Sequence, residues 1–412
     1  MICGLIGRKL GHSYSPQIHR ALADYDYRLW ELELEEVEPF LRRRQFAGIN
    51  VTIPYKQVVM PFLDEISQRA RAIGAVNTIV NRDGRLYGEN TDFDGMAALI
   101  RRIGIDMTGK KVLILGTGGT SGTAGAVARS MGAADIHWVS RSGQNGALTY
   151  EQAAACCKDA QVIINTSPCG MYPAVEDCPV DVSDYPALVG VVDAVYNPLR
   201  SNLVLQARRR GIPAEGGLYM LAAQAACASA LFRGCEAAPQ ESEVAFQTVR
   251  RQMENLVLIG MPSCGKTTVG RRLAALTGKR FADSDAQVIE KTGMSIGDYF
   301  AAYGQAAFRD REQEAVAALA AVGGQVIATG GGVILREENL TALRRNGVLV
   351  FLDRSPEKLL ATPDRPLSAD RDALYRRYEE RYSRYCAAAD LHIDGDGSVE
   401  ETARLIEKEW LQ

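Results

Sequence analysis

Hydrophobic residues recur in short continuous runs along the whole chain, separated by stretches in which they recur every three or four positions. The short runs are typical of strands buried on both faces of a parallel sheet, and the spaced pattern is typical of amphipathic helices. The clearest runs cover residues 2–6, 47–51, 111–115, 135–139, 161–165, 191–195, 256–259, 326–328 and 348–353. Helical spacing follows several of them, as at Val269, Leu273 and Leu276. This alternation predicts an α/β fold.

The run at 256–259 is followed by a motif with a known physical role. Gly260 to Thr267 reads G-x-x-x-x-G-K-T, the phosphate-binding loop, with a strand before it and an amphipathic run after it. Such a loop turns backbone N–H groups and a helix N-terminus toward phosphate oxygens. Lys266 would reach the β- and γ-phosphates, and the Thr267 hydroxyl would hold Mg²⁺. We therefore predict a nucleotide site here, about 250 residues into the chain.

Length and composition narrow the class of protein. A chain of 412 residues is too long for one typical core, so two or three domains are expected. With 47% hydrophobic residues, 24% charged residues and a net charge of −3, the composition does not indicate a general affinity for nucleic acid or anionic membranes. No apolar run approaches the ~20 residues that span a bilayer, and the N-terminus does not resemble a signal peptide. The nine cysteines show neither disulfide nor zinc spacing, so a cytoplasmic protein is expected. The oligomeric state stays open.

Polar motifs stand beside the first predicted strands. Ser13 and Ser15, within GHSYSP, precede a helix start, where two hydroxyls either cap the helix or bind a polar ligand; capping is the default interpretation. Pro54 ends the strand at 47–51 and exposes Thr52 and Lys56 at its end, where ligands bind in α/β sheets.

Two further motifs follow before residue 100. Asn77, within GAVNT, begins another apolar strand, and Asp92, within GENTD, precedes a helical stretch from Phe93. Asp92 alone could be a helix cap. The four motifs GHSYSP, NVTIPYK, GAVNT and GENTD, in this order, closely resemble the shikimate dehydrogenase family.

A dinucleotide fingerprint follows the strand at 111–115. Read as G-x-G-x-x-G from Gly116, the third glycine position holds Ser121, so the generic motif is imperfect, although the G-x-G-G form of the family is kept. The next strand ends in Ser140-Arg141-Ser142 instead of the acidic residue that binds the ribose of NAD. A cation with hydroxyls suits a 2′-phosphate, so NADP is predicted in preference to NAD.

The resemblance implies roles for residues of the first half. Lys56 and Asp92 would be the catalytic pair for reduction of a ring ketone, with the ammonium stabilising the developing alkoxide. Further substrate contacts would come from Ser13, Ser15, Thr52, Asn77, Tyr196 and, on a helix returning to the substrate domain, Gln224. The cofactor residues would be Gly116, Thr117, Gly118, Gly119, Thr120, Ser140, Arg141, Ser142, Ala194 and Gly217. Ser201 and Asn202 depart mildly from the family, which has Thr after the YNP loop, and we expect this change to affect packing.

The second half carries the motifs GKT, DSD, FRDRE, TGGG, RPL and R-x-x-x-Y, which together resemble the shikimate kinase family over about 255–412. The resemblance implies roles for the matching positions of this chain. Asp285 would bind the acceptor hydroxyl and help to activate it. Arg309 and Arg381 would pair with the substrate carboxylate, and Gly331 would add a backbone contact. Two aspartates two residues apart at a strand end would point the same way, with Asp283 supporting Mg²⁺ through water. The nucleotide residues would be Ser263, Cys264, Gly265, Lys266, Thr267, Thr268 and, in the lid, Arg365.

One departure concerns that lid. Residues 359–364 form a shorter segment before RPL than is usual in the family, and Ala361 stands where a basic residue is common. This departure concerns the movement of the lid and the affinity for ATP, and it leaves the expected reaction unchanged.

The sequence therefore predicts a fusion of a shikimate dehydrogenase (about 1–252) and a shikimate kinase (about 254–412). The expected domains are an α/β substrate domain at 1–100 completed by return helices at about 218–252, a Rossmann NADP domain at 101–217, and a P-loop kinase domain with a parallel sheet at 254–412. The products would be shikimate, made with NADPH, and shikimate 3-phosphate, made with ATP and Mg²⁺.

Three alternative functions remain. A catabolic quinate or shikimate dehydrogenase would be favoured by an acid in place of Arg141. A kinase for another polyol such as gluconate would not need both Arg309 and Arg381. A non-catalytic role would require loss of Lys56, Asp92, Lys266 or Asp285, and the chain keeps all four.

Overall fold

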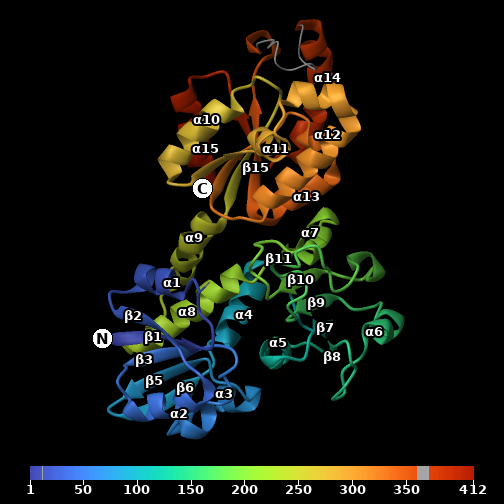
Figure 1. Ribbon diagram of the computed structural model, residues 1–412. Helices are drawn as coiled ribbons and strands as arrows, with labels where there is room; N and C mark the ends of the chain where they lie inside the picture. The colour runs from blue at the N-terminus through green and yellow to red at the C-terminus, as the bar shows by residue number, and fades with distance from the viewer. Residues whose placement is uncertain (12, 360–370) are drawn as a thin grey trace. The chain divides into compact units, whose positions relative to one another are not determined.

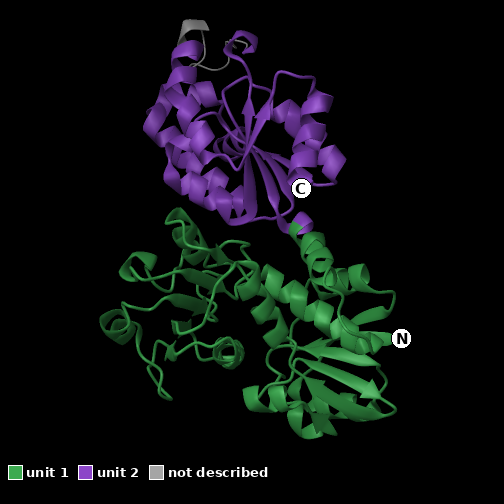
Figure 2. Ribbon diagram, turned by 180° about the vertical axis from the view of Figure 1, so that it is seen from behind, with its two compact units in different colours: residues 1–250 green, residues 251–412 purple. Residues whose placement is uncertain are grey.

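The computed structural model describes residues 1–11, 13–359 and 371–412, with the backbone alone for residues 371–373. The chain divides into two compact units, Met1–Arg250 and Arg251–Gln412 (Figure 2). Each unit has its own sheets and cores, so each is described by itself. No helix in the described part of the chain is long and apolar enough to cross a membrane.

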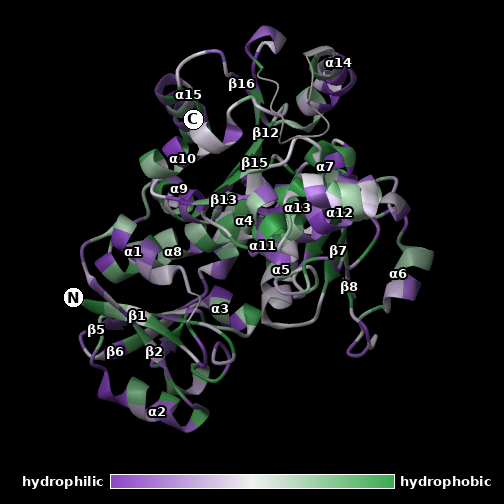
Figure 3. Ribbon diagram, turned by 45° about the horizontal axis from the view of Figure 1, so that its top comes forward, coloured by the Kyte–Doolittle hydropathy of each residue, from purple (hydrophilic) through white to green (hydrophobic). Residues whose placement is uncertain are grey.

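The first sheet of unit 1 has six strands in the order β2-β1-β3-β5-β6-β4 (Figure 1). The strands are β1 Ile2–Gly7, β2 Asp26–Glu31, β3 Gly48–Val51, β4 Glu65–Ile66, β5 Thr78–Arg82 and β6 Arg85–Glu89. β1 pairs in parallel with β2 and β3, whereas β5 runs antiparallel to β3 and β6. The helices along this part of the chain are α1 Ser15–Leu22, α2 Leu34–Arg43 and α3 Gln68–Ile73. Figure 3 shows the hydrophilic and hydrophobic faces of α2, whose Val37 and Leu41 are buried.

The second sheet of unit 1 has the order β11-β10-β9-β7-β8, and every adjacent pair is parallel. The strands are β7 Lys111–Leu115, β8 Asp135–Val139, β9 Val162–Asn165, β10 Gly190–Asp193 and β11 Ala214–Glu215. The helices are α5 Gly119–Ser130, α6 Tyr150–Cys156 and α7 Asn202–Arg209. Hydrophobic clusters bury both faces of the central strands, as the continuous apolar runs predict.

Two helices connect these sheets. α4 (Asp92–Arg102) packs along α8 (Leu218–Arg233), and α4 also contacts α5, while α8 contacts α1, β3 and β5. The two helices approach closely at Gly95, where a Cβ atom would lie 2.5 Å from the carbonyl oxygen of Met220. Because Asp92 begins α4 and Gln224 lies within α8, this packing sets the separation of two expected substrate residues. α9 (Glu241–Met253) then ends unit 1 and begins unit 2.

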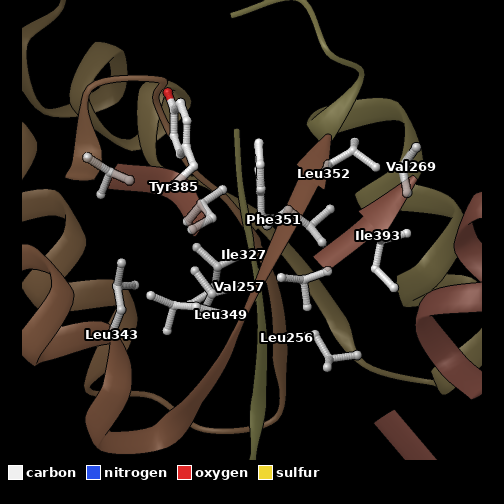
Figure 4. Packing of buried hydrophobic residues seen from close by; sticks show 14 of the residues in the cluster. Leu256, Val257, Val269, Ile327, Leu343, Leu349, Phe351, Leu352, Tyr385 and Ile393 are labelled. Atoms are coloured by element: carbon white, nitrogen blue, oxygen red, sulfur yellow. The ribbon is translucent and has the colours of Figure 1, made fainter. Parts of the chain in front are cut away.

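Unit 2 is built on a five-stranded parallel sheet in the order β13-β14-β12-β15-β16. The strands are β12 Asn255–Ile259, β13 Arg280–Asp283, β14 Gln325–Ala328, β15 Gly347–Asp353 and β16 Leu391–Asp394. The helices are α10 Lys266–Thr277, α11 Ser284–Thr292, α12 Ile296–Ala320, α13 Glu337–Asn346, α14 Arg371–Ala388 and α15 Val399–Leu411. Side chains of β12 and β15, among them Leu256, Val257 and Phe351, are fully buried in the core (Figure 4). The predicted α/β class and parallel sheets are confirmed.

Candidate active sites

Unit 1 contains a cavity of about 370 Å³. It is lined by every substrate residue that the sequence predicts for this unit: Ser13, Ser15, Thr52, Lys56, Asn77, Asp92, Tyr196 and Gln224. Three predicted cofactor residues, Thr120, Ala194 and Gly217, line the same cavity. Residues separated by up to about two hundred positions in the sequence therefore meet around one space large enough for a small ring compound.

The central feature of this cavity is an ion pair between Lys56 and Asp92. Lys56 Nζ lies 2.5 Å from Asp92 Oδ2, and the two side chains are 21% and 11% exposed. Asn77 Nδ2 lies 3.0 Å from the other carboxylate oxygen, Oδ1, and 3.3 Å from Gln224 Oε1. The position of Asp92 in the first turn of α4 also favours its negative charge. The carboxylate is thus held at both oxygens, and it fixes the ammonium group at the cavity.

None of Ser13, Ser15 and Asp92 occupies the N-cap position of a helix. The N-cap of α1 is Tyr14 and that of α4 is Thr91, and neither helix has a side-chain cap hydrogen bond. Ser13 Oγ instead donates to Ser15 Oγ at 3.1 Å and accepts from the Ser15 backbone N–H at 3.2 Å. The hydroxyls of this motif therefore remain beside the cavity.

Asn50 is a cavity residue that the sequence reasoning missed. Its Oδ1 accepts a hydrogen bond of 2.8 Å from Tyr27 Oη, and its Nδ2 donates to Thr78 Oγ1 at 3.2 Å. Tyr27 stacks on His19 with ring centroids 4.0 Å apart, and burial lowers the pKa of His19 to about 3, so this imidazole is neutral. The available signal was a single polar side chain within the buried apolar run of β3.

The loop after β7 leaves room for a dinucleotide. Gly116 has φ +109, and a Cβ atom at Gly118 or Gly119 would meet nothing within 4 Å. Gly118 is the N-cap of α5 and has no side chain to satisfy the first N–H groups, which leaves them available to a pyrophosphate. Ser121, at the imperfect third position, bonds Gly118 O at 2.6 Å. The close helix-to-strand packing occurs instead at Gly125, where a Cβ atom would lie 2.5 Å from the Trp138 ring.

The other expected cofactor residues follow the ends of β8, β10 and β11 in the same sheet. Arg141 and Ser142 are exposed after β8, and Ser140 Oγ accepts the Gly143 N–H at 3.1 Å. Gly217 packs so tightly against the loop after β10 that a Cβ atom would lie 2.2 Å from Ala194 O. The geometry fits a nucleotide that runs from the α5 N-terminus to the Lys56 cavity.

In unit 2, the phosphate-binding loop has the geometry that its motif predicts. Lys266 begins α10 and is buried, with Nζ 2.9 Å from Gly260 O and 2.7 Å from Met261 O. The loop requires left-handed backbone at Ser263 (φ 66) and Gly265 (φ 99). Lys266 is thereby held at the mouth of the loop, where it can reach a bound phosphate.

Thr267 and Asp283 lie together, as a shared Mg²⁺ role requires. Thr267 Oγ1 donates to Asp283 Oδ2 at 2.9 Å. β13 ends at Asp283, which caps α11 through the Asp285 and Ala286 N–H groups, so Asp285 belongs to a helix. The expectation that both aspartates share a strand end is wrong. In the described ranges no cluster of three or more His, Cys, Asp or Glu has metal-binding spacing, so Mg²⁺ would need phosphate oxygens as additional ligands.

The TGGG loop after β14 lies between the other kinase residues. A Cβ atom at Gly330 would lie 2.6 Å from Asp285 Oδ1, and one at Gly332 would lie 2.0 Å from Arg309 Nη1. The carbonyl oxygen of Gly331 accepts hydrogen bonds from Arg381 Nη1 at 3.0 Å and from Tyr385 Oη at 2.5 Å. The missing side chains thus allow a carboxylate and two guanidinium groups to gather around one backbone segment.

Glu312 lies beside the expected substrate residues of unit 2, and the sequence alone did not single it out. It is 1% exposed, and its Oε2 lies 2.6 Å from Arg309 Nη1. Burial raises the pKa of Glu312, and the Arg309 guanidinium opposes that shift. Its position three residues after Arg309 on one helix was the available signal. The predicted lid residue Arg365 lies outside the described residues.

The comparisons identify both units. Residues 5–79 match the family model described as shikimate dehydrogenase substrate binding domain, and residues 262–410 match the model described as shikimate kinase. The shikimate dehydrogenase (NADP(+)) of Clostridium beijerinckii is 35% identical over 250 residues, which cover 57% of this chain and 92% of that protein. The chain belongs to the shikimate dehydrogenase family. Because the shikimate kinase model matches the second unit, the chain combines two domains of the shikimate pathway and is a bifunctional enzyme, as predicted.

Solved structures agree with the fold of the dehydrogenase unit. A chorismate mutase/shikimate 5-dehydrogenase fusion protein from Clostridium acetobutylicum is 32% identical, with a TM-score of 0.57, covering 60% of this chain and 96% of that one. The shikimate 5-dehydrogenase of Thermus thermophilus, solved with NADP(H) and shikimate, is 29% identical, with a TM-score of 0.55 and coverages of 60% and 99%.

Proposed function

We propose that unit 1 reduces 3-dehydroshikimate to shikimate with NADPH, and that unit 2 phosphorylates the 3-hydroxyl of shikimate with ATP and Mg²⁺. The observation that carries the first activity is the Lys56–Asp92 pair at a cavity shared by hydroxyl, amide and dinucleotide-loop residues. The convergence of Lys266, Asp285 and Arg309 near the glycine loops carries the second.

In the reduction, NADPH supplies a hydride to the ketone carbon when it is bound. Lys56 holds a proton at Nζ beside the ketone oxygen, where it stabilises the developing alkoxide and can complete the alcohol. Asp92 orients that ammonium through the 2.5 Å contact between Asp92 Oδ2 and Lys56 Nζ. Asn77 and Gln224 fix the substrate hydroxyls, while Ser13 and Ser15 bind the ring carboxylate.

The preference for NADP rests on Arg141. Its exposed guanidinium, between two serine hydroxyls at the end of β8, suits a ribose 2′-phosphate, and the segment Ser140–Ser142 offers no carboxylate for a free 2′-hydroxyl. We expect Arg141→Ala to raise the KM for NADPH about tenfold or more and to leave the KM for NADH nearly unchanged. An equal effect on both cofactors would contradict this role.

In the kinase unit, the 260–265 loop and Lys266 hold the nucleotide phosphates, and Thr267 with Asp283 positions the Mg²⁺ that neutralises them. Ser263, Cys264, Gly265 and Thr268 contribute their backbone or side-chain groups to the same loop. Arg365 would close over the nucleotide from the lid.

The acceptor side uses the residues around the TGGG loop. Arg309 and Arg381 pair with the substrate carboxylate, for which planar guanidinium groups are suited. Gly331 offers a backbone contact, and Asp285 accepts a hydrogen bond from the attacking hydroxyl and helps to remove its proton. Positioning and charge neutralisation then supply the catalysis.

We assign the substrate domain to residues 1–100 with 218–252, the NADP domain to 101–217 and the kinase domain to 254–412, since each has its own sheet. All nine cysteines are free, and this fits a cytoplasmic enzyme.

One coupled reaction tests both activities. Dehydroshikimate and NADPH are supplied first and ATP with Mg²⁺ second, and both products are followed by chromatography. Lys56→Ala should abolish shikimate formation while phosphorylation of added shikimate continues. Lys266→Ala should do the reverse. Loss of both steps in either variant, or of neither, would contradict the assignment.

A further inference from the structure

Arg354 is a cation beside the phosphate-binding loop that the proposed chemistry does not use. It follows β15 directly, and β15 pairs in parallel with β12 so that Phe351 lies opposite Ile259. Arg354 therefore follows the position that lies level with Ile259, the last residue of β12 before the loop, by three residues. The end of β15 also lies close to the loop, because a Cβ atom at Gly260 would lie 2.7 Å from Leu352 O.

The Arg354 side chain extends to the far end of the same loop. Its Nη1 lies 3.6 Å from the position that a Cβ atom would take at Gly265. Gly265 is the N-cap of α10, directly before Lys266, and it has no side chain to satisfy the N–H groups of that helix. Arg354 therefore places a positive charge where the loop and the helix N-terminus already favour an anion.

The carboxylates of Asp353, which precedes Arg354, and of Asp396, which binds the following Ser355, have other partners among the described residues. Asp353 Oδ1 accepts a hydrogen bond of 3.2 Å from Tyr378 Oη, and Asp353 Oδ2 lies 2.8 Å from His392 Nε2. Asp396 accepts hydrogen bonds from Ser355 Oγ and lies 3.3 Å from Lys358 Nζ. Arg354 Nε is buried and has no hydrogen-bond partner among the described residues.

A buried N–H of a cation without an acceptor costs free energy, and such a group signals a ligand that supplies the acceptor. We propose that Arg354 is a nucleotide-binding residue of the kinase unit, with its guanidinium in direct contact with the nucleotide held by the 260–265 loop. The planar cation can donate to phosphate oxygens or lie against the base. This inference rests on the proposed use of ATP by unit 2 and adds a residue that neither the P-loop motif nor the lid motif contains.

The test is a binding titration of the full-length chain with the non-hydrolysable analogue AMP-PNP and Mg²⁺. We expect Arg354→Ala to raise the Kd about tenfold or more, and Arg354→Lys, which keeps the charge, to recover part of the affinity. The KM for ATP should rise with the Kd, while the KM for shikimate stays within about twofold. Arg404→Ala is the matched control, since Arg404 is a 62% exposed arginine of the same unit paired with Glu400.

The outcomes separate the alternatives. An unchanged Kd in Arg354→Ala would overturn the inference, and so would a parallel rise of the shikimate KM with a lowered melting temperature, which indicates a structural role. Failure of the wild-type chain to bind AMP-PNP would contradict the proposed kinase function itself. A second titration with Mg²⁺ tripolyphosphate locates the contact: weakened binding in the variant assigns it to the phosphate chain, and unchanged binding assigns it to the nucleoside.

Discussion

The hydroxyl of Ser201 donates a hydrogen bond of 2.5 Å to Oδ2 of Asp193, a carboxylate that is fully buried. Oδ1 of the same carboxylate accepts from Asn165 Nδ2 and from the Val195 N–H, both at 2.9 Å. Asp193 therefore connects the ends of β9 and β10 with the start of α7, directly beside Ala194 at the cavity. The substitution of Ser for Thr at position 201 thus keeps the hydroxyl that this connection requires.

This carboxyl should make the stability of unit 1 depend on pH. Burial raises the pKa of Asp193 to about 6 against the hydrogen bonds that oppose the shift. The Asp193 carboxyl then binds its proton more tightly in the folded unit than in the unfolded chain. The stability that this proton adds is complete below the pKa that Asp193 has in the unfolded chain, and it is lost as pH rises through about 6. Asp193→Asn keeps the shape without the charge. Relative to wild type, it should gain up to ~3 kcal/mol in free energy of unfolding between about pH 4 and pH 8.

Calorimetry of the full-length chain measures this effect in the transition that NADP⁺ shifts to higher temperature. Asp159→Asn is the control. The hydrogen bond from Lys111 lowers the pKa of the exposed Asp159, so any change of stability from its titration occurs below pH 3.8. Parallel stability curves for wild type and Asp193→Asn would contradict the expectation.

Lys56→Ala should separate chemistry from cofactor binding. The variant removes the ammonium group that the proposed mechanism places beside the ketone, so kcat should fall by about 10²- to 10⁴-fold. The Kd for NADPH, measured by nicotinamide fluorescence, should change little, since the substitution leaves the dinucleotide loop after β7 and Arg141 unchanged. Lys158→Ala, at an exposed lysine of the same unit, is the control. A rate near that of wild type would eliminate Lys56 from the mechanism.

Glu312→Gln should weaken shikimate binding by the kinase unit. The variant removes the charge that holds Arg309 Nη1 at 2.6 Å, so the guanidinium loses its fixed orientation toward the substrate carboxylate. We expect kcat/KM for shikimate to fall about tenfold or more, with the Kd for AMP-PNP unchanged. Glu314→Gln is the matched control, because Glu314 pairs with Arg311 on the exposed side of the same helix. Equal effects of the two substitutions would remove the special role of Glu312.

Gly217→Ala should impair the dehydrogenase by displacing backbone. The new Cβ atom would lie 2.2 Å from Ala194 O, which cannot be relieved by a side-chain rotation, so the loop after β10 must shift. We expect a stability loss of about 1–3 kcal/mol and a clearly raised KM for NADPH, measured by calorimetry and steady-state kinetics. Gly122→Ala is the control, since its Cβ atom would meet its nearest neighbour, Ile73 O, at 3.5 Å. Similar behaviour of the two variants would contradict this account.

Much of the fold could be predicted because the central strands bury both faces. β7 and β8 have the bounds that their apolar runs predict, and β12 begins one residue earlier. β2 was not predicted, because its sequence, DYRLWE, contains no apolar run, and most of its residues are exposed at the sheet edge. An edge strand on a polar surface is specified by its pairing partner, here β1, and that partner is distant in sequence.

The candidate sites likewise contain some residues that could be predicted from the sequence and others that could not. Residues within contiguous motifs, such as Lys56 and Lys266, could be named from the sequence because motif spacing determines their local geometry. Asn50 and Glu312 could not, since each depends on which face of its element turns inward. In the FRDRE stretch, Phe308, Arg309 and Glu312 are buried while Asp310 and Arg311 are exposed, and four adjacent charges conceal that helical phase.

Two carboxyl groups beside the TGGG loop have a consequence for product release by the kinase unit. A Cβ atom at Gly330 would lie 2.6 Å from Asp285 Oδ1 and 2.8 Å from Glu312 Oε1, so two carboxyl groups border the same small space. Before transfer, the acceptor presents an uncharged hydroxyl to Asp285. After transfer, the same oxygen carries a phosphate group of about two negative charges, which Asp285 repels. In the proposed mechanism, the carboxylate that orients the substrate therefore also promotes departure of the product.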